Sequence, residues 1–147
     1  MITLIKAIEM DNTLIKNTII LDSNQESINK VTSYIDSIYS SSKNDMSDTY
    51  GNVIIAITEA VNNAVNHGNK ADSTKKVTIS CKKTDEKLYF TVEDEGDGFD
   101  YENVPDPTDP ENLHKLNGRG IFLMKNLVDE IYFHEEGREI ELIFKIT

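Results

Sequence analysis

Residues 57–69 read Ile-Thr-Glu-Ala-Val-Asn-Asn-Ala-Val-Asn-His-Gly-Asn and form the most informative segment of the chain. Their apolar residues recur at helical spacing, which predicts the end of a helix with one apolar face. Glu59, Asn63 and Asn66 fall on roughly the opposite side. Glu59 and Asn63 are neighbours there because they stand four residues apart. Gly68 is expected to end the helix in a left-handed conformation.

The chain around this segment has the composition of a soluble globular protein. Its 147 residues, of which 38% are hydrophobic and 28% charged, predict one domain over residues 1–147. The formal net charge of −11 argues against a general binder of nucleic acid or of anionic membranes, because recognition of many phosphates requires clustered Lys and Arg.

The cysteine content and the beginning of the chain predict a cytoplasmic protein. Cys81 is the single cysteine, so an intrachain disulfide and a cysteine zinc cluster are excluded. Residues 1–6 lack the pattern of a secretory leader, and no apolar run approaches the roughly 20 residues of a membrane span.

Extended segments and helices alternate in a recognisable order. Residues 2–8 and 13–21 are predicted to be strands. A helix should follow the capping-box pattern of Ser23 and Glu26. The second helix, which Asp48 or a neighbour should cap, leads into residues 57–69.

The second half of the chain contains the remaining strands and one further helix. A hairpin is predicted over residues 77–83 and 88–93, and a second hairpin over 130–134 and 139–146. Residues 99–117 lack an apolar pattern and contain all three prolines, which indicates a long flexible lid. Together these elements predict an α/β (α+β) fold, a two-layer sandwich whose mixed sheet is mainly antiparallel.

Three polar motifs follow one another along the chain. The first is the pair Glu59 and Asn63, because an amide oxygen can ligate a hard cation and a carboxylate can accept a proton. The second is Asp94-x-Gly96-x-Gly98, whose glycines permit close backbone approach and whose aspartate can accept a hydrogen bond from an exocyclic amine.

The third motif is Gly118-x-Gly120, which opens a helix whose free N–H groups suit a phosphate. Taken singly, the three motifs are also compatible with a solvated helix face, a plain turn and the end of a loop. A calcium loop at residues 93–104 is excluded because Val104 stands where the bidentate acid belongs. The chain also lacks a P-loop motif.

The three motifs in this order resemble the GHKL (Bergerat-fold) ATPases, and most closely the anti-sigma-factor serine kinases of bacterial partner-switching systems. Residues 58–64 with His67 and Gly68 resemble the N box, residues 94–99 the first glycine box and residues 117–121 the second. The resemblance runs from the Ser23 helix to the last strand.

The resemblance implies a Bergerat ATP-binding fold with ATP and Mg²⁺ as cofactors. Asn63 would ligate Mg²⁺, Asp94 would recognise the adenine amino group, and Glu59 would be the catalytic base. The remaining residues implied to bind ATP or to shape its pocket lie in the two glycine boxes: Gly96, Gly98, Gly118, Arg119 and Gly120.

The resemblance also implies a function and partners. The chain would sequester a sigma factor or similar client, and as an ATP-dependent serine/threonine protein kinase it would phosphorylate a small anti-anti-sigma antagonist protein. A homodimer is implied as well, whereas direct contact with nucleic acid or membrane is not expected.

Two positions depart from the family pattern. Some of these kinases carry an arginine just before the second glycine box, where this chain has Leu116 after Lys115, and many carry a threonine where Arg138 follows Gly137. The first departure motivates an alternative function, a protein-binding regulator that ATP gates with little or no phosphotransfer. A histidine-kinase fragment and an α/β domain without nucleotide are weaker alternatives.

Overall fold

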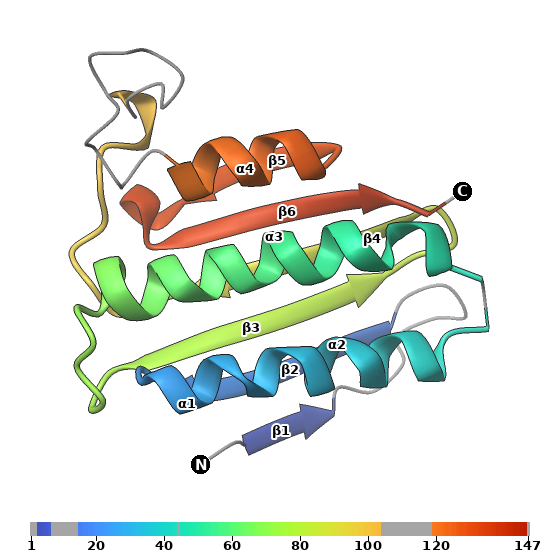
Figure 1. Cartoon of the computed structure of the whole chain (residues 1–147), viewed down its shortest axis with the longest axis horizontal. Helices are drawn as coiled ribbons and strands as arrows, with labels where there is room; N and C mark the ends of the chain where they lie inside the picture. Colours follow the sequence, from blue (N-terminus) through green and yellow to red (C-terminus); the bar gives the residue numbers. More distant parts are fainter. Residues whose placement is uncertain (1–2, 7–14, 44, 104–118, 147) are drawn as a thin grey trace.

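The strands form an antiparallel sheet in the computed structural model, which describes residues 3–6, 15–43, 45–103 and 119–146. Within these residues the sheet has six strands in the order β1-β2-β3-β4-β6-β5, and each of its pairings is antiparallel. The strands are β1 (Thr3–Lys6), β2 (Ile15–Asp22), β3 (Lys76–Lys83), β4 (Lys87–Glu93), β5 (Glu130–His134) and β6 (Glu139–Lys145). Figure 1 shows them side by side.

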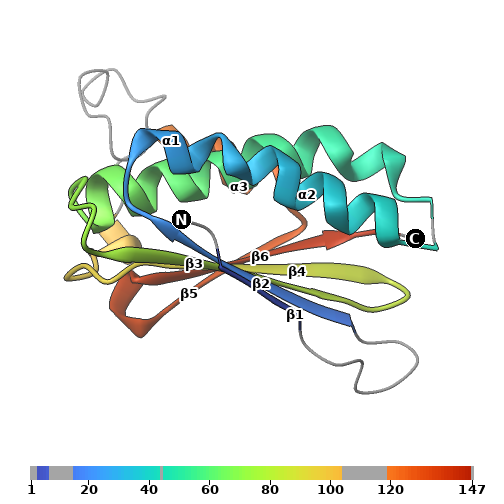
Figure 2. The same cartoon turned by 90° about the horizontal axis from the view of Figure 1, so that it is seen from below.

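The helices cover one face of this sheet, as Figure 2 shows. They are α1 (Gln25–Ile28), α2 (Lys30–Ser41), α3 (Tyr50–Asn63) and α4 (Arg119–Leu127). Short turns complete the described elements: η1 (Ser47–Thr49), η2 (Ala64–Gly68), η3 (Tyr101–Asn103) and η5 (Glu135–Gly137). The predicted two-layer α/β sandwich is therefore confirmed, with antiparallel pairings throughout the described strands.

The buried face of the sheet follows from the period-two alternation of apolar residues. Ile19, Ile79, Val92 and Ile140 lie opposite one another on four neighbouring strands, and each is buried. The other face is polar: Thr18, Ser80 and Thr91 stand in register, and the hydroxyls of Thr18 and Ser80 lie 3.2 Å apart. Only one face therefore requires a covering layer of helices.

Helix α3 is the central helix of this layer. The five residues predicted to form its apolar face are all buried: Val53, Ile57, Ala60, Val61 and Ala64. Glu59, Asn62 and Asn63 are only partly buried, and Asn66 is exposed. The spacing of apolar residues thus predicted correctly which side of α3 packs on the sheet.

The end of α3 differs from the prediction. Its last turn, η2, is a π turn in which the Asn69 N–H donates to the Ala64 carbonyl at 2.8 Å. Gly68 does not adopt a positive φ, whereas Lys70 and Ala71 do, with φ of 53° and 57°. The predicted left-handed cap at Gly68 is therefore wrong, and another reason must explain the glycine.

One of the two predicted helix caps is also corrected. Asn24 caps α1 by accepting a hydrogen bond from the Ser27 N–H, whereas the Ser23 hydroxyl donates to the Lys75 carbonyl at 2.8 Å. The capping position of α3 is Thr49, the neighbour of Asp48, so the predicted position is confirmed, although the Thr49 side chain makes no capping hydrogen bond.

The predicted lid lies mostly outside the described residues. Phe99 and the short turn η3 belong to its beginning, and residues 104–117 are not described. Among the described helices, none combines the length and the apolar character needed to cross a bilayer.

The core makes a direct prediction about stability. Phe90 is fully buried and packs edge-on against Phe144, with ring centroids 6.0 Å apart. Phe90→Ala should lower the free energy of unfolding by about 3–5 kcal/mol, because it removes apolar contacts and leaves a cavity. Urea unfolding followed by circular dichroism measures this change.

Phe122→Ala is the matched control, because Phe122 lies on α4 with 43% of its surface exposed. It should change the free energy of unfolding by less than about 1 kcal/mol. Equal losses from the two substitutions would contradict the assignment of Phe90 to the core.

Candidate functional site

A pocket opens where the end of α3 meets α4, the end of β4 and the start of β6. Its volume is about 240 Å³. Asn63, Asp94 and Gly98 line it together with apolar side chains that include Met124 and Ile140. Two of the three predicted motifs therefore contribute directly to one cavity.

Asp94 is the acidic residue of this pocket, and it lies directly after β4. Its backbone N–H donates to the Arg138 carbonyl at 2.9 Å, and its Oδ1 accepts the Gly96 N–H at 2.8 Å. Burial raises the pKa of its carboxyl, while the Gly96 hydrogen bond and the Arg138 charge offset part of that rise. The carboxylate is thus held in a fixed orientation within a partly apolar wall.

Gly68 explains how α3 approaches this carboxylate. A Cβ at position 68 would overlap with the carboxylate of Asp94, and a Cβ at Gly96 would overlap with the Gly68 carbonyl. The two glycines therefore allow the end of the helix and the loop after β4 to touch. Close packing, rather than a left-handed conformation, accounts for glycine at position 68.

The other side of the loop packs on the turn between β5 and β6. Gly98 and Gly137 have positive φ values of 80° and 91°, and the Phe99 N–H donates to the Glu136 carbonyl at 3.1 Å. A Cβ at Gly98 would overlap with that carbonyl. The predicted role of Gly98 in shaping the backbone is consistent with this contact.

Aromatic residues form the rim of the pocket beside this turn. Tyr101 and Phe133 stack with ring centroids 4.9 Å apart, and Phe99 contacts both rings edge-on. Phe99 and Phe133 also line the pocket. The first residues of the predicted lid are thereby joined to β5.

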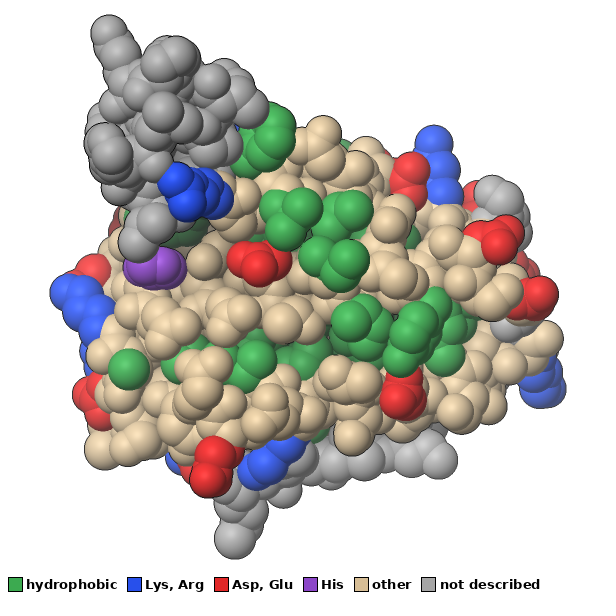
Figure 3. All heavy atoms as spheres, viewed as in Figure 1, with side chains coloured by type: hydrophobic (Ala, Val, Ile, Leu, Met, Phe, Trp, Pro, Cys, Tyr) green, Lys and Arg blue, Asp and Glu red, His purple; other side chains and the backbone are tan. Residues whose placement is uncertain are grey.

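Glu59 and Asn63 lie where α4 crosses the polar side of α3. A Cβ at Gly120 would lie 2.9 Å from Nδ2 of Asn63 and 3.1 Å from Oε2 of Glu59. Figure 3 shows this helical face, where hydrophobic side chains gather over α3 and α4 near an acidic group. Gly120 therefore brings the first turn of α4 against both polar residues.

The remaining predicted residues differ in their relation to the pocket. Gly96 donates its backbone N–H to Asp94, and Arg119 begins α4 with an exposed side chain. Gly118 lies outside the described residues. Glu59 adjoins the pocket through its contact with Gly120 but does not line it. The individual functional roles of all these residues stay predictions.

Sequence patterns missed several pocket residues. Arg138 lines the pocket next to Asp94, and Met124 and Phe133 contribute apolar walls. In the sequence, Arg138 stood out only because it follows Gly137 where the family often has threonine. Met124 and Phe133 fit an ordinary helix and strand pattern, which gives no sign of a pocket. Their placement depends on how α4 and β5 return to the end of β4, which local spacing does not encode.

The described residues contain no group of three or more His, Cys, Asp or Glu side chains that could hold a metal ion. Asn63 is the residue at the pocket with a neutral amide oxygen, a ligand type that hard cations accept. Cys81 is buried in β3, and burial raises the pKa of its thiol, as expected for a packing residue.

Comparison with known proteins gives two findings. The model of the histidine kinase-like ATPase domain matches residues 21–144. The chain is also 35% identical over 89 residues to proteins named serine-protein kinase RsbW from Staphylococcus aureus strains JH9, Newman and NCTC 8325 / PS 47.

Each of these matches covers 56% of this chain and 56% of the relative, so the chain matches just over half the length of these relatives. The family model spans the two motifs that line the pocket, and it extends from the end of β2 to β6. The chain therefore belongs to the histidine kinase-like ATPase family.

Proposed function

We propose that the chain binds ATP with Mg²⁺ and phosphorylates a serine or threonine of an antagonist protein of the anti-anti-sigma type. The observation that carries this proposal is that Asp94 and Asn63 line one pocket. Glu59 lies next to Asn63, where Gly120 of α4 packs against both side chains. The RsbW proteins that the chain resembles are named serine-protein kinases, which supports the reaction class.

The adenine base would occupy the apolar part of the pocket. Val92, Met124 and Ile140 offer apolar contacts, and the partly buried Asp94 carboxylate would accept a hydrogen bond from the exocyclic amine. The Gly96 N–H on Oδ1 keeps the carboxylate oriented before the ligand binds. This preorganisation would favour adenine over bases that present an acceptor at the same position.

Magnesium would be held by the amide oxygen of Asn63 together with the phosphates of ATP. A single neutral protein ligand fits a hard cation that usually retains water and phosphate ligands. When bound, Mg²⁺ would neutralise charge on the phosphates. The absence of a bulky side chain at Gly120 lets the first turn of α4 lie next to this amide.

Glu59 would orient the hydroxyl of the substrate and accept its proton. The hydroxyl oxygen would form a bond to the terminal phosphorus as the bond to the bridging oxygen breaks and ADP leaves. The carboxylate stands one turn before Asn63 on α3, so the base and the metal ligand have a fixed spacing.

The partners and the setting belong to the same proposal. The chain would sequester a sigma factor or a similar client in the cytoplasm, act as a homodimer, and release the client when the antagonist engages. It would contact neither nucleic acid nor membrane directly, in keeping with its net charge of −11.

A second candidate function follows from Leu116. In that case ATP would gate the affinity for a protein partner through the lid, with little or no transfer, because an arginine is missing before the second glycine box. Tight binding of ATP without phosphoserine or phosphothreonine on any partner would favour this function.

Replacement of Asp94 tests the adenine site. Asp94→Asn should weaken binding of ATP about 10- to 100-fold. The amide oxygen would keep the hydrogen bond from the Gly96 N–H, so the amide NH2 would face the amine of adenine, and these two donors cannot pair. Isothermal titration calorimetry with Mg-ATP measures the affinity. Asp97→Asn is the control, since Asp97 is exposed in the same loop, and equal losses would contradict the role of Asp94.

Replacement of Glu59 tests the transfer step. Glu59→Gln should reduce labelling of the antagonist from radiolabelled ATP by about 10²- to 10⁴-fold while ATP affinity stays within a few-fold, because the amide cannot accept the proton. Glu26→Gln, an exposed residue of α1, should leave labelling unchanged. Equal labelling by Glu59→Gln and the unmodified chain would remove Glu59 from the mechanism.

Replacement of Gly120 tests the contact between α4 and α3. Gly120→Ala should weaken binding of Mg-ATP by about 10-fold, because the new methyl group crowds Asn63 and displaces its amide. Gly51→Ala adds the same methyl group where no atom lies within 4 Å, so it should raise stability by about 0.5–1 kcal/mol without affecting ATP. Unchanged ATP affinity in Gly120→Ala would contradict the proposal that close packing of α4 on Asn63 is needed for binding of Mg-ATP.

A further inference from the structure

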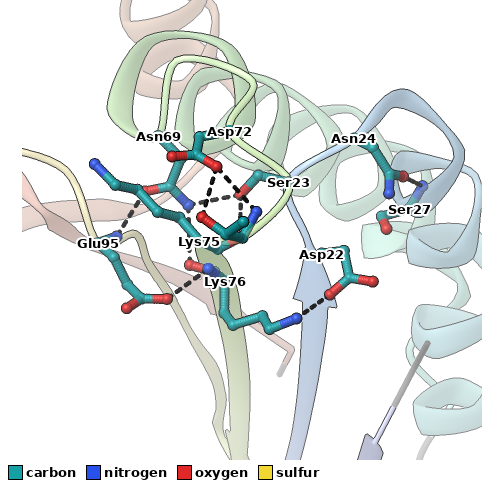
Figure 4. Close-up of polar contacts among 10 residues, drawn as sticks. Asp22, Ser23, Asn24, Ser27, Asn69, Asp72, Lys75, Lys76 and Glu95 are labelled. Carbon is teal, nitrogen blue, oxygen red and sulfur yellow. Dashed lines mark hydrogen bonds and ion pairs between the residues drawn. The ribbon is translucent and has the colours of Figure 1, made fainter.

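Asn69 follows the proposed nucleotide-binding segment and is buried, with 1% of its surface exposed. A buried polar side chain is costly unless its donors and acceptor are all used. Figure 4 shows Asn69 surrounded by polar groups from separate segments of the chain. Its side chain therefore fixes the position of each segment that it touches.

The amide of Asn69 joins three separate segments of the chain. Its Nδ2 donates to the Ser23 hydroxyl at 2.7 Å and to the Lys76 carbonyl at 3.0 Å. Its Oδ1 accepts the backbone N–H of Glu95 at 2.8 Å. The end of α3 is thus tied to the turn after β2, to the start of β3 and to the loop after β4.

Two further hydrogen bonds close these contacts into a ring. The Glu95 carboxylate accepts the Lys76 N–H at 2.5 Å, and the Ser23 hydroxyl donates to the Lys75 carbonyl at 2.8 Å. Glu95 is therefore held by its backbone through Asn69 and by its side chain through Lys76. A residue restrained at both ends has little freedom to move.

This ring restrains Asp94, the residue proposed to bind the base, through the peptide between Asp94 and Glu95. Asp94 immediately precedes Glu95, and Gly68, which abuts the Asp94 carboxylate, immediately precedes Asn69. Residues 68 and 69 consequently contact residues 94 and 95 at two successive points. Loss of the Asn69–Glu95 hydrogen bond would free the peptide that carries the Asp94 carboxylate.

We infer that Asn69 is a positioning residue that aligns the Asp94 carboxylate with the exocyclic amine of the nucleotide base. This inference rests on the proposed function, in which Asp94 reads adenine. Asn69 does not touch the ligand; its effect is to preorganise the group that does. It predicts that Asn69 determines base preference and contributes less to binding of the phosphates.

The test compares ATP with purine riboside triphosphate, which lacks the exocyclic amine but is otherwise the same. The unmodified chain should bind ATP about 10-fold more tightly, a ratio typical of one hydrogen bond to a charged group. Asn69→Ala should reduce this ratio to about 2-fold or less, as should Asp94→Ala. Calorimetry of both nucleotides gives the ratio, and circular dichroism establishes that each variant is folded.

Two further substitutions separate positioning from simple stability. Asn69→Ser is a milder change whose short hydroxyl cannot reach the Glu95 N–H, so it should also lose the preference. Asn69→Asp keeps an acceptor for that N–H, so it should retain the preference. Its second carboxylate oxygen would face the Lys76 carbonyl, so its melting temperature should fall. Ser23→Ala removes a partner on the far side of Asn69, so it should lower the melting temperature while the ratio stays near 10-fold.

The outcomes distinguish this inference from the function on which it rests. A ratio that Asp94→Ala reduces but Asn69→Ala and Asn69→Ser leave at about 10-fold overturns the positioning role alone. A ratio that Asp94→Ala does not change overturns base reading by Asp94, and the positioning role with it. Equal loss of preference in Ser23→Ala and Asn69→Ala would assign the effect to general destabilisation and would also overturn the inference.

Discussion

The contact between Gly68 and Asp94 is the constraint on which the site depends. Helix and sheet normally remain apart by the thickness of their side chains, yet here the end of α3 touches the loop after β4 because position 68 has no Cβ. That approach lets Asn63 and Asp94 share one small cavity and places Asn69 within reach of Glu95. Core packing between α3 and the sheet fixes the distance between them, so the pocket depends on the fold as a whole.

Local patterns predicted the layers and much of the site. Alternation in β3 and β4 marked the sheet, and the spacing of Ile57, Ala60 and Val61 marked the buried side of α3. The same spacing placed Glu59 and Asn63 on the partly exposed side. These inferences succeeded because each depends on residues a few positions apart, for which helix and strand periods are reliable guides.

Other features were not predictable because they depend on partners far along the chain. The position of Gly68 at the end of the helix predicted a left-handed cap. Glycine is instead required there because the Asp94 carboxylate, from another element, leaves no room for a Cβ. Ser23 suited a capping box, but its hydroxyl bonds to Lys75, and Asn24 supplies the cap instead. Arg138 joins the pocket only because β6 pairs with β4. Sequence spacing identifies the chemical groups, whereas the topology decides which of them meet.

The π turn at the end of α3 makes the pitch of the helix a determinant of the pocket's geometry. A turn closed between Ala64 and Asn69 contains one residue more than an α-helical turn, so every residue after it is rotated relative to a regular helix. The rotation directs Gly68 and Asn69 toward the loop after β4. An α-helix of regular pitch would present the same two residues in a different direction, with the same sequence and the same core. In this protein a single extra residue within a helix therefore sets the alignment between the Asn63 side and the Asp94 side of the pocket.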